Sequence, residues 1–95
     1  MRLTTLQQQM IKRYFLEIFK EGKIYLFGSR VDDTKKGGDI DLYIEPVDRK
    51  NLVRKKVDFL VKLKREIGNQ KIDIVFDRGE SRLIDKIAKQ EGVVL

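Results

Sequence analysis

Hydrophobic and polar residues repeat along this chain with two different periods, and each change of period marks the boundary of a predicted element. An apolar residue every three or four positions predicts an amphipathic helix, whereas strict alternation predicts a half-buried strand. The predicted helices cover residues 3–19, 48–66 and 81–90, and the predicted strands cover residues 23–27, 39–45 and 71–77, with a short edge strand over 93–95. A polar loop over residues 28–38 separates the first two strands.

The second helix has the longest amphipathic pattern, and its apolar stripe is expected to cover the sheet. That stripe consists of Val53, Val57, Leu60, Leu63 and Ile67. Three further apolar residues, Leu52, Phe59 and Val61, lie partly off the stripe. They are either scattered surface residues or a contact surface for another chain.

Alternating helices and strands predict the α/β (α+β) class, with a small mixed sheet of three or four strands and helices on one face. The chain has 95 residues, which is enough for a single domain over residues 1–95. Thr4 or Thr5, each followed three residues later by a glutamine, can cap the first helix, and Gly22 is expected to end it.

Three aspartates are predicted to converge on the other face of this sheet. Side chains alternate along a strand, so Asp39 and Asp41 share a face about 6.6 Å apart while the apolar residues between and beyond them are buried. Asp73 stands in the same kind of pattern. If the strands over 39–45 and 71–77 are neighbours, all three carboxylates form one patch.

The composition limits what such a patch can bind. The chain contains no histidine and no cysteine, so any metal must be bound by oxygen atoms, and Mg²⁺ prefers carboxylate oxygens. Two such ions about 3.5–4 Å apart can clamp a phosphate during in-line displacement. We therefore predict that Asp39 and Asp41 bridge two Mg²⁺ ions, while Asp73 binds the catalytic ion and accepts the proton of the attacking hydroxyl.

A Gly-Ser pair directly after the first strand completes the candidate site. Gly28 allows phosphate oxygens to approach the backbone, Ser29 offers a hydroxyl and an amide donor, and Arg30 adds a charge-assisted contact. Taken singly, the pair is also typical of an ordinary turn, and alternating aspartates are typical of a solvated strand face. Three acids on one small face would, however, repel one another without a ligand.

Charge and hydropathy leave several classes of partner open. The net charge is +6, and basic residues are concentrated over residues 49–65. This basic run is either the solvated face of the second helix or a surface that steers a phosphate or a partner protein. Nucleic-acid binding is disfavoured, because the aromatic residues lie in apolar stripes and not among the basic ones. No apolar segment suits a membrane span or a signal peptide, which favours a cytoplasmic location.

Three motifs resemble those of the DNA polymerase beta nucleotidyltransferase superfamily, in particular its minimal nucleotidyltransferases, which are stand-alone domains of about this length. The motifs are Gly28-Ser29-Arg30, Gly38-Asp39-Ile40-Asp41-Leu42 and Ile72-Asp73-Ile74. The resemblance covers nearly the whole chain and implies a polymerase-beta-like nucleotidyltransferase core. It also implies that Asp39, Asp41 and Asp73 bind two Mg²⁺ ions, with Gly28 and Ser29 holding the triphosphate.

The resemblance further implies a partner. Minimal nucleotidyltransferases are typically encoded beside a HEPN toxin, and the implied function is an antitoxin that transfers AMP from ATP to a tyrosine of that toxin. Leu52, Phe59 and Val61 on the basic helix are then candidates for docking it. Two alternatives remain: a catalytically silent antitoxin that neutralises its partner by complex formation, and a small basic nucleic-acid-binding protein.

Overall fold

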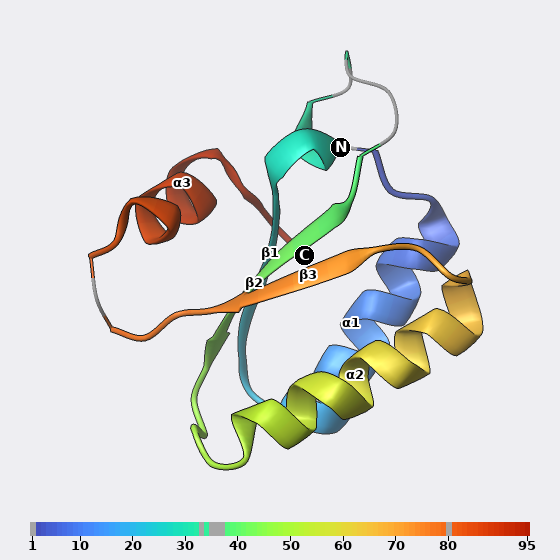
Figure 1. The fold of residues 1–95 in the computed structure, drawn as a ribbon, viewed down its shortest axis with the longest axis horizontal. Helices are drawn as coiled ribbons and strands as arrows, with labels where there is room; N and C mark the ends of the chain where they lie inside the picture. Colours follow the sequence, from blue (N-terminus) through green and yellow to red (C-terminus); the bar gives the residue numbers. More distant parts are fainter. Residues whose placement is uncertain (1, 33, 35–37, 80) are drawn as a thin grey trace.

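The computed structural model describes residues 2–32, 34, 38–79 and 81–95 (Figure 1). Its elements in chain order are α1 (Thr5–Phe19), β1 (Gly22–Phe27), the 3-10 turn η1 (Gly28–Val31), β2 (Ile40–Pro46), α2 (Leu52–Ile67), β3 (Ile72–Phe76), α3 (Leu83–Glu91) and β4 (Val93–Val94). Every predicted helix and strand is therefore confirmed. Residues 33 and 35–37 of the predicted polar loop lie outside the described residues. Within the described ranges, no helix is long and apolar enough to cross a membrane.

The start of α1 follows the predicted capping pattern. The Thr4 hydroxyl accepts a hydrogen bond from the Gln7 amide at 3.0 Å, and the Gln7 side chain accepts one from the Thr4 amide at 2.9 Å. Gly22 does not end this helix, which already stops at Phe19. Instead Gly22 begins β1 with a φ of +117°, and a side chain there would collide with the Glu45 carbonyl on β2. This glycine permits the pairing of the two strands.

The sheet has four strands in the order β3-β2-β1-β4, which confirms the predicted mixed sheet. β1 pairs with β2 and with β4 in antiparallel fashion, whereas β2 and β3 are parallel. Parallel neighbours need a long crossover, and α2 provides it. Leu26 faces Leu42, and Asp41 faces Asp73, across the strand pairs. The topology thus brings two of the predicted acids into register.

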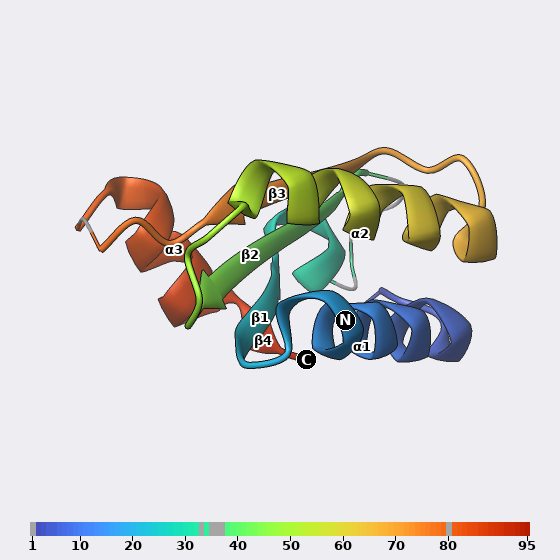
Figure 2. The same ribbon diagram turned by 90° about the horizontal axis from the view of Figure 1, so that it is seen from below.

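Helices cover both faces of this sheet, but to different extents. Figure 2 shows α1 and α2 side by side on one face and α3 on the other. Aliphatic side chains of β1, β2 and β3 pack against α1 and α2 in the larger core, which includes Phe15, Phe59 and Leu63. The smaller core lies between α3 and the aromatic residues Tyr25, Phe27 and Tyr43. This arrangement corrects the expectation that helices lie on one face only.

The buried stripe of α2 also differs from the predicted one. Phe59 and Leu63 are fully buried, while Val53 is 79% exposed and Val57 is 53% exposed. Leu60, Leu63 and Ile67 contact the larger core as predicted, but Phe59 is buried in place of Val53 and Val57 in the first half of the helix. Leu52 packs against the same core. Leu52 and Phe59 are therefore unavailable for docking, and that expectation was wrong for both.

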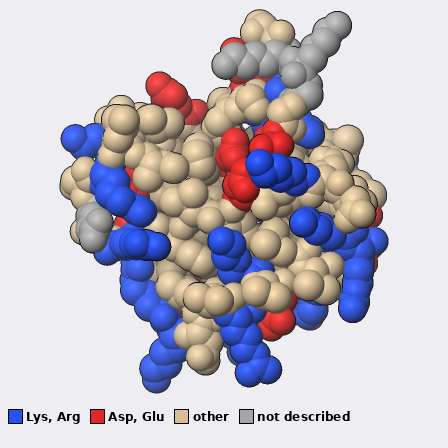
Figure 3. All heavy atoms as spheres, viewed as in Figure 1, with Lys and Arg blue, Asp and Glu red and all other residues tan. Residues whose placement is uncertain are grey.

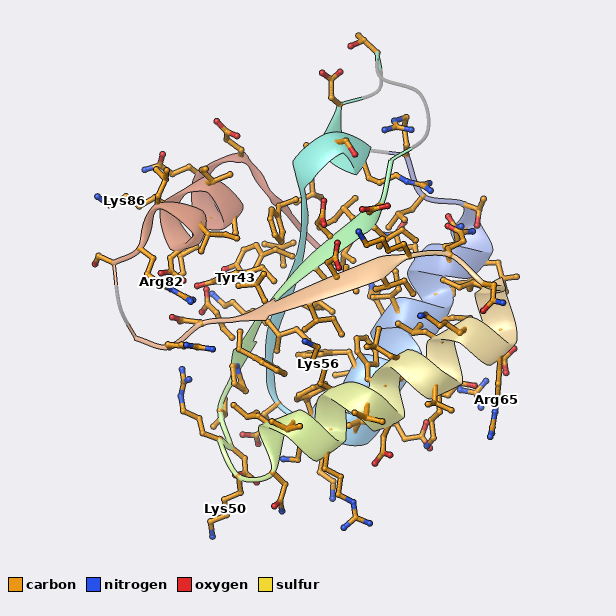
Figure 4. The ribbon with its side chains drawn as sticks, viewed as in Figure 1. Tyr43, Lys50, Lys56, Arg65, Arg82 and Lys86 are labelled. Carbon is orange, nitrogen blue, oxygen red and sulfur yellow. The ribbon has the colours of Figure 1, made fainter. Side chains whose placement is uncertain are left out.

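The last helix is anchored to the sheet by a polar cluster. Asp85 is 3% exposed, and its carboxylate accepts hydrogen bonds from the Tyr43 hydroxyl at 2.7 Å and from the Arg82 amide at 2.8 Å. The Arg82 guanidinium also contacts this carboxylate and donates to the Phe76 carbonyl at 2.8 Å. Figure 4 shows Arg82 and Tyr43 next to each other where α3 meets β2 and β3. Leu83, the first residue of α3, is 74% exposed.

Candidate active site

The three predicted aspartates lie on the face of the sheet that α3 only partly covers. Asp41 in β2 and Asp73 in β3 are register partners of parallel strands, so their side chains point to the same side. Asp39 directly precedes β2 and shares the alternation of Asp41. Figure 3 shows acidic side chains gathered on this face beside a basic one. The expectation that the two strands are neighbours is confirmed.

The charges in this patch are not balanced by one another. The pKa of Asp41 is raised above its ordinary value, first because the carboxyl is partly buried and second because the charges of Asp73 and Asp39 oppose its ionisation. Among the described residues, Lys71 forms an ion pair with this patch, and its ammonium lies 3.3 Å from a carboxylate oxygen of Asp39. Within the described part of the chain, the patch thus carries excess negative charge that a further cation would relieve.

This donor set suits Mg²⁺. All three side chains supply carboxylate oxygens, and their mutual repulsion favours a divalent cation between them. As they stand, the described residues contain no group of three or more potential ligands arranged around a metal position. The ammonium of Lys71 lies beside Asp39 instead. Binding of an ion by Asp39, Asp41 and Asp73 would therefore require side-chain movement, and it remains a prediction.

The Gly-Ser turn lies directly beside Asp41. Gly28 has a φ of +76°, and a Cβ atom at this position would collide with the Asp41 carboxylate. Gly38 on the far side of the loop has a φ of +91°, and a Cβ there would collide with the Ser29 hydroxyl. Both glycines have a positive φ that other residues rarely adopt, and a side chain at either position would have to displace the neighbouring carboxylate or hydroxyl. These approaches place the turn next to the acids.

Arg30 is engaged within the protein. Its guanidinium donates hydrogen bonds to the Gly38 carbonyl at 3.2 Å, the Arg2 carbonyl at 3.0 Å and the Gln70 side chain at 3.3 Å. These bonds join the Gly-Ser turn to the start of β2 and to the segment before β3. The predicted contact of Arg30 with phosphate remains a prediction, and such a contact would have to share donors with these partners.

Arg2 is a site residue that the sequence did not indicate. Its side chain donates to the Ser29 carbonyl at 2.8 Å and to the Asp32 carbonyl at 2.9 Å, and its amide donates to the Arg30 carbonyl at 2.7 Å. Arg2 therefore holds the Gly-Ser turn from outside. Only its charge distinguished it in the sequence, because no motif or spacing connects the chain terminus with residues 28–32.

Two hollows border the Gly-Ser turn. The first, of about 470 Å³, is polar and positively charged; it is lined by Arg2, Leu3, Thr4, Gln7, Arg30, Gly38, Gln70 and Lys71. The second, of about 350 Å³, lies between η1 and α3; it is lined by Gly28, Ser29, Val31, Asp32, Ile87 and Glu91. The cations of the first hollow suit phosphate groups. The apolar side chains of the second, Val31 and Ile87, suit a flat apolar ring system.

Comparison with known proteins identifies one matching family. The model of one family, described as the nucleotidyltransferase domain, matches residues 9–95. The match includes the Gly-Ser turn and all three aspartates, and it leaves out only the first eight residues. A search of curated proteins found no match.

Proposed function

We propose that this chain, which belongs to the nucleotidyltransferase domain family, transfers AMP from ATP to a hydroxyl group of a partner protein. Membership of the family supports nucleotidyl transfer as the general activity and the chain as a transferase. The choice of ATP, the use of Mg²⁺, a tyrosine of a HEPN toxin as the acceptor, and the role of antitoxin are our proposal. The pairing of Asp41 with Asp73, beside Asp39 and Gly28, is the observation that carries it.

The roles of the side chains follow from their positions. Asp39, Asp41 and Asp73 would hold Mg²⁺, which neutralises phosphate charge and acidifies the attacking hydroxyl when bound. Asp73 on β3 accepts the hydroxyl proton. The acceptor oxygen forms a bond to the α-phosphorus of ATP as the bond to the bridging oxygen breaks, and pyrophosphate leaves. The backbone of Gly28 and Ser29 and the positively charged hollow position the phosphates.

A protein acceptor is supported by the outer surface of α2. Val53, Val57 and Val61 form an exposed apolar stripe on this helix, with exposures of 79%, 53% and 46%. Basic side chains flank the stripe, and Figure 4 shows Lys50 and Arg65 pointing outward near the two ends of the helix. An apolar stripe with basic edges suits a protein surface that is apolar and acidic. These valines replace Leu52 and Phe59 as the docking candidates. We propose the cytoplasm, where ATP is abundant, as the location.

Label transfer tests this proposal. The chain is incubated with ATP labelled at the α-phosphate, Mg²⁺ and a candidate HEPN partner, and the partner is then analysed for covalently bound label. We expect transfer by the wild type and none by the Asp39→Asn, Asp41→Asn double variant. Glu21→Gln, at an exposed position between α1 and β1 and outside the proposed site and docking surface, is the control and is expected to retain full transfer.

Two outcomes would contradict the proposal in different ways. Absence of label on every tested partner, with intact chain and partner, would reject the proposed acceptor. If the double variant still protected cells from the toxin as well as the wild type does, the protein would act by complex formation alone, which is the catalytically silent alternative.

A further inference from the structure

Lys71 lies at the boundary between the acidic patch and the positively charged hollow. It directly precedes β3, where its carbonyl accepts a hydrogen bond from the Ile40 amide at 3.1 Å. Its ammonium lies 3.3 Å from Asp39, and Asp73 and Asp41 are near enough to interact with its charge as well. The same side chain lines the hollow that contains Arg2 and Arg30. Lys71 therefore faces both proposed binding regions.

We propose that Lys71 takes the place of a metal ion at Asp39 when no nucleotide is bound, and thereby makes metal binding dependent on the nucleotide. This inference rests on the proposed use of Mg²⁺ by the three aspartates. It assigns to Lys71 the role of a positioning residue, because Lys71 would act through Asp39 and not on the reacting atoms.

Competition between the ammonium and a metal follows from their charges. A divalent cation bound by Asp39 and Asp41 would lie within a few ångströms of the present position of the Lys71 ammonium and would be repelled by it. To bind the metal, Asp39 must exchange its ammonium partner for the ion. The side chain of Lys71 is 70% exposed, so it can leave without disturbing the core.

Phosphates bound in the positively charged hollow beside Lys71 would favour movement of the ammonium away from Asp39. Among the described residues, the hydrogen bonds of Arg2 and Arg30 go to carbonyl and amide oxygens and not to carboxylates, so both guanidinium charges remain unbalanced. Phosphates that enter the hollow would attract the ammonium away from Asp39. Metal and nucleotide would then strengthen each other's binding, and this coupling must be reciprocal.

A purely structural role for the Lys71 and Asp39 pair predicts something different. Both side chains are well exposed, at 70% and 43%, and exposed ion pairs of this kind contribute little to folding. If stability were its only role, loss of the ammonium would slightly destabilise the fold and would leave the affinity for metal unchanged.

Binding of Mn²⁺, measured by the electron paramagnetic resonance signal of the free ion, tests the inference without relying on enzyme activity. We expect Lys71→Met to bind Mn²⁺ roughly tenfold more tightly than the wild type when nucleotide is absent. In the presence of an ATP analogue with a non-cleavable α,β bridge, this difference should shrink. Lys71→Arg keeps the charge and should resemble the wild type. Lys64→Met on the exposed surface of α2 removes the same net charge far from the acids and should have no effect.

The possible results separate this inference from the proposed function. If Lys71→Met binds Mn²⁺ no more tightly than the wild type, while the Asp39→Asn, Asp41→Asn variant binds none, the role of Lys71 is overturned and the metal site stands. If wild type and double variant bind Mn²⁺ equally, the metal site itself is rejected, and the inference fails with it.

Discussion

The two faces of the sheet are built from the same strands but have opposite properties. On β2, Ile40, Leu42 and Ile44 point toward α1 and α2, and each has no exposed surface. Asp41 and Tyr43 alternate with them and point to the other side. The first face is aliphatic and sealed by two long helices, whereas the second is aromatic and acidic and is covered only where α3 lies.

This difference divides the sheet into one face that stabilises the fold and another face that is proposed to carry the chemistry. Under α3 the polar groups are paired, as in the contact of Tyr43 with Asp85. Beyond α3, the described residues pair the three acids with one cation, Lys71, and the raised pKa of Asp41 reflects its partial burial next to Asp73 and Asp39. The sealed face supplies the hydrophobic stabilisation that allows the other face to hold unfavourable charge. Each prediction below changes one face and leaves the other intact.

Among the variants considered, Asp41→Asn should have the largest effect, and the effect should be on nucleotidyl transfer. Loss of this carboxylate is expected to lower nucleotidyl transfer roughly 10⁴-fold, equivalent to about 5.5 kcal/mol in the activation free energy. Transfer kinetics with labelled ATP measure this loss, with Glu21→Gln as the control. A loss of less than about tenfold would remove Asp41 from the catalytic groups.

The same variant should be more stable than the wild type at neutral pH without metal. The folded-state pKa of Asp41 is raised, so the folded protein binds its proton more tightly than the unfolded chain does. Stability is therefore lost as the pH rises from the ordinary aspartate value through the raised pKa. Thermal unfolding should show a higher Tm for Asp41→Asn at pH 7, and the two proteins should converge below about pH 4.

Phe59→Ala tests the sealed face. Phe59 is fully buried and stacks edge-on against Phe19 at 5.8 Å between ring centroids. We expect its loss to lower the free energy of unfolding by about 3–5 kcal/mol in urea titrations. Val57→Ala, two residues away and 53% exposed, should change it by less than about 0.5 kcal/mol. If Val57→Ala lowered the free energy of unfolding more than Phe59→Ala, the orientation of α2 predicted from the sequence would be the correct one.

Gly28→Ala should reduce nucleotidyl transfer roughly 100-fold, because the new methyl group would displace the Asp41 carboxylate. Gly68→Ala is the matched control. Gly68 also has a positive φ, of +89°, but no atom lies within 4 Å of the position of its Cβ. Both variants lose similar backbone stability, so only contact with Asp41 would separate their activities. Equal activities would show that the position of Asp41 does not depend on Gly28.

Tyr43→Phe should have the smallest effect on stability. Tyr43 lies on the acidic face of the sheet where α3 covers it. The substitution removes the buried hydrogen bond to Asp85 and should lower the free energy of unfolding by about 1–3 kcal/mol. Tyr14→Phe removes an exposed hydrogen bond to Glu66 and should change the free energy of unfolding far less than Tyr43→Phe does. Similar losses for both would show that burial does not strengthen the Tyr43 contact.

The Asp85 cluster also predicts that the stability of the fold depends on pH in the acidic range. Hydrogen bonds from Arg82 and Tyr43 hold the pKa of Asp85 well below its ordinary value. A carboxyl of this kind stabilises the fold above its unfolded pKa, and the stabilisation is lost as the pH falls through the folded pKa. Tyr43→Phe should therefore weaken the acid-induced decline in the Tm.

The sequence was a good guide wherever a property depends on neighbours along the chain. The Thr4 cap and the alternation that puts Asp39 and Asp41 on one face are both set by local backbone geometry. The sequence also indicated that the strands carrying Asp41 and Asp73 could be neighbours, because both combine acids with buried aliphatic residues in the same alternating pattern.

The sequence was a poor guide to contacts between distant segments. It placed Val57 in the core and Phe59 outside it, because a helical stripe has the same period whichever way the helix turns. It did not indicate that Arg2 would hold the Gly-Ser turn or that Lys71 would lie between acids and hollow. Lysine and arginine occur on every exposed surface, so their type and spacing carry little information about position.

By itself, then, the sequence predicted which residues would carry the proposed chemistry, and it determined the face of the strand on which they lie, since alternation is a property of the extended backbone. Only the tertiary structure decided the orientation of α2, the placement of α3 over part of the acidic face, and the ion pair of Lys71 with Asp39. These features depend on which surfaces pack together, and packing involves contacts between segments that are distant in the sequence.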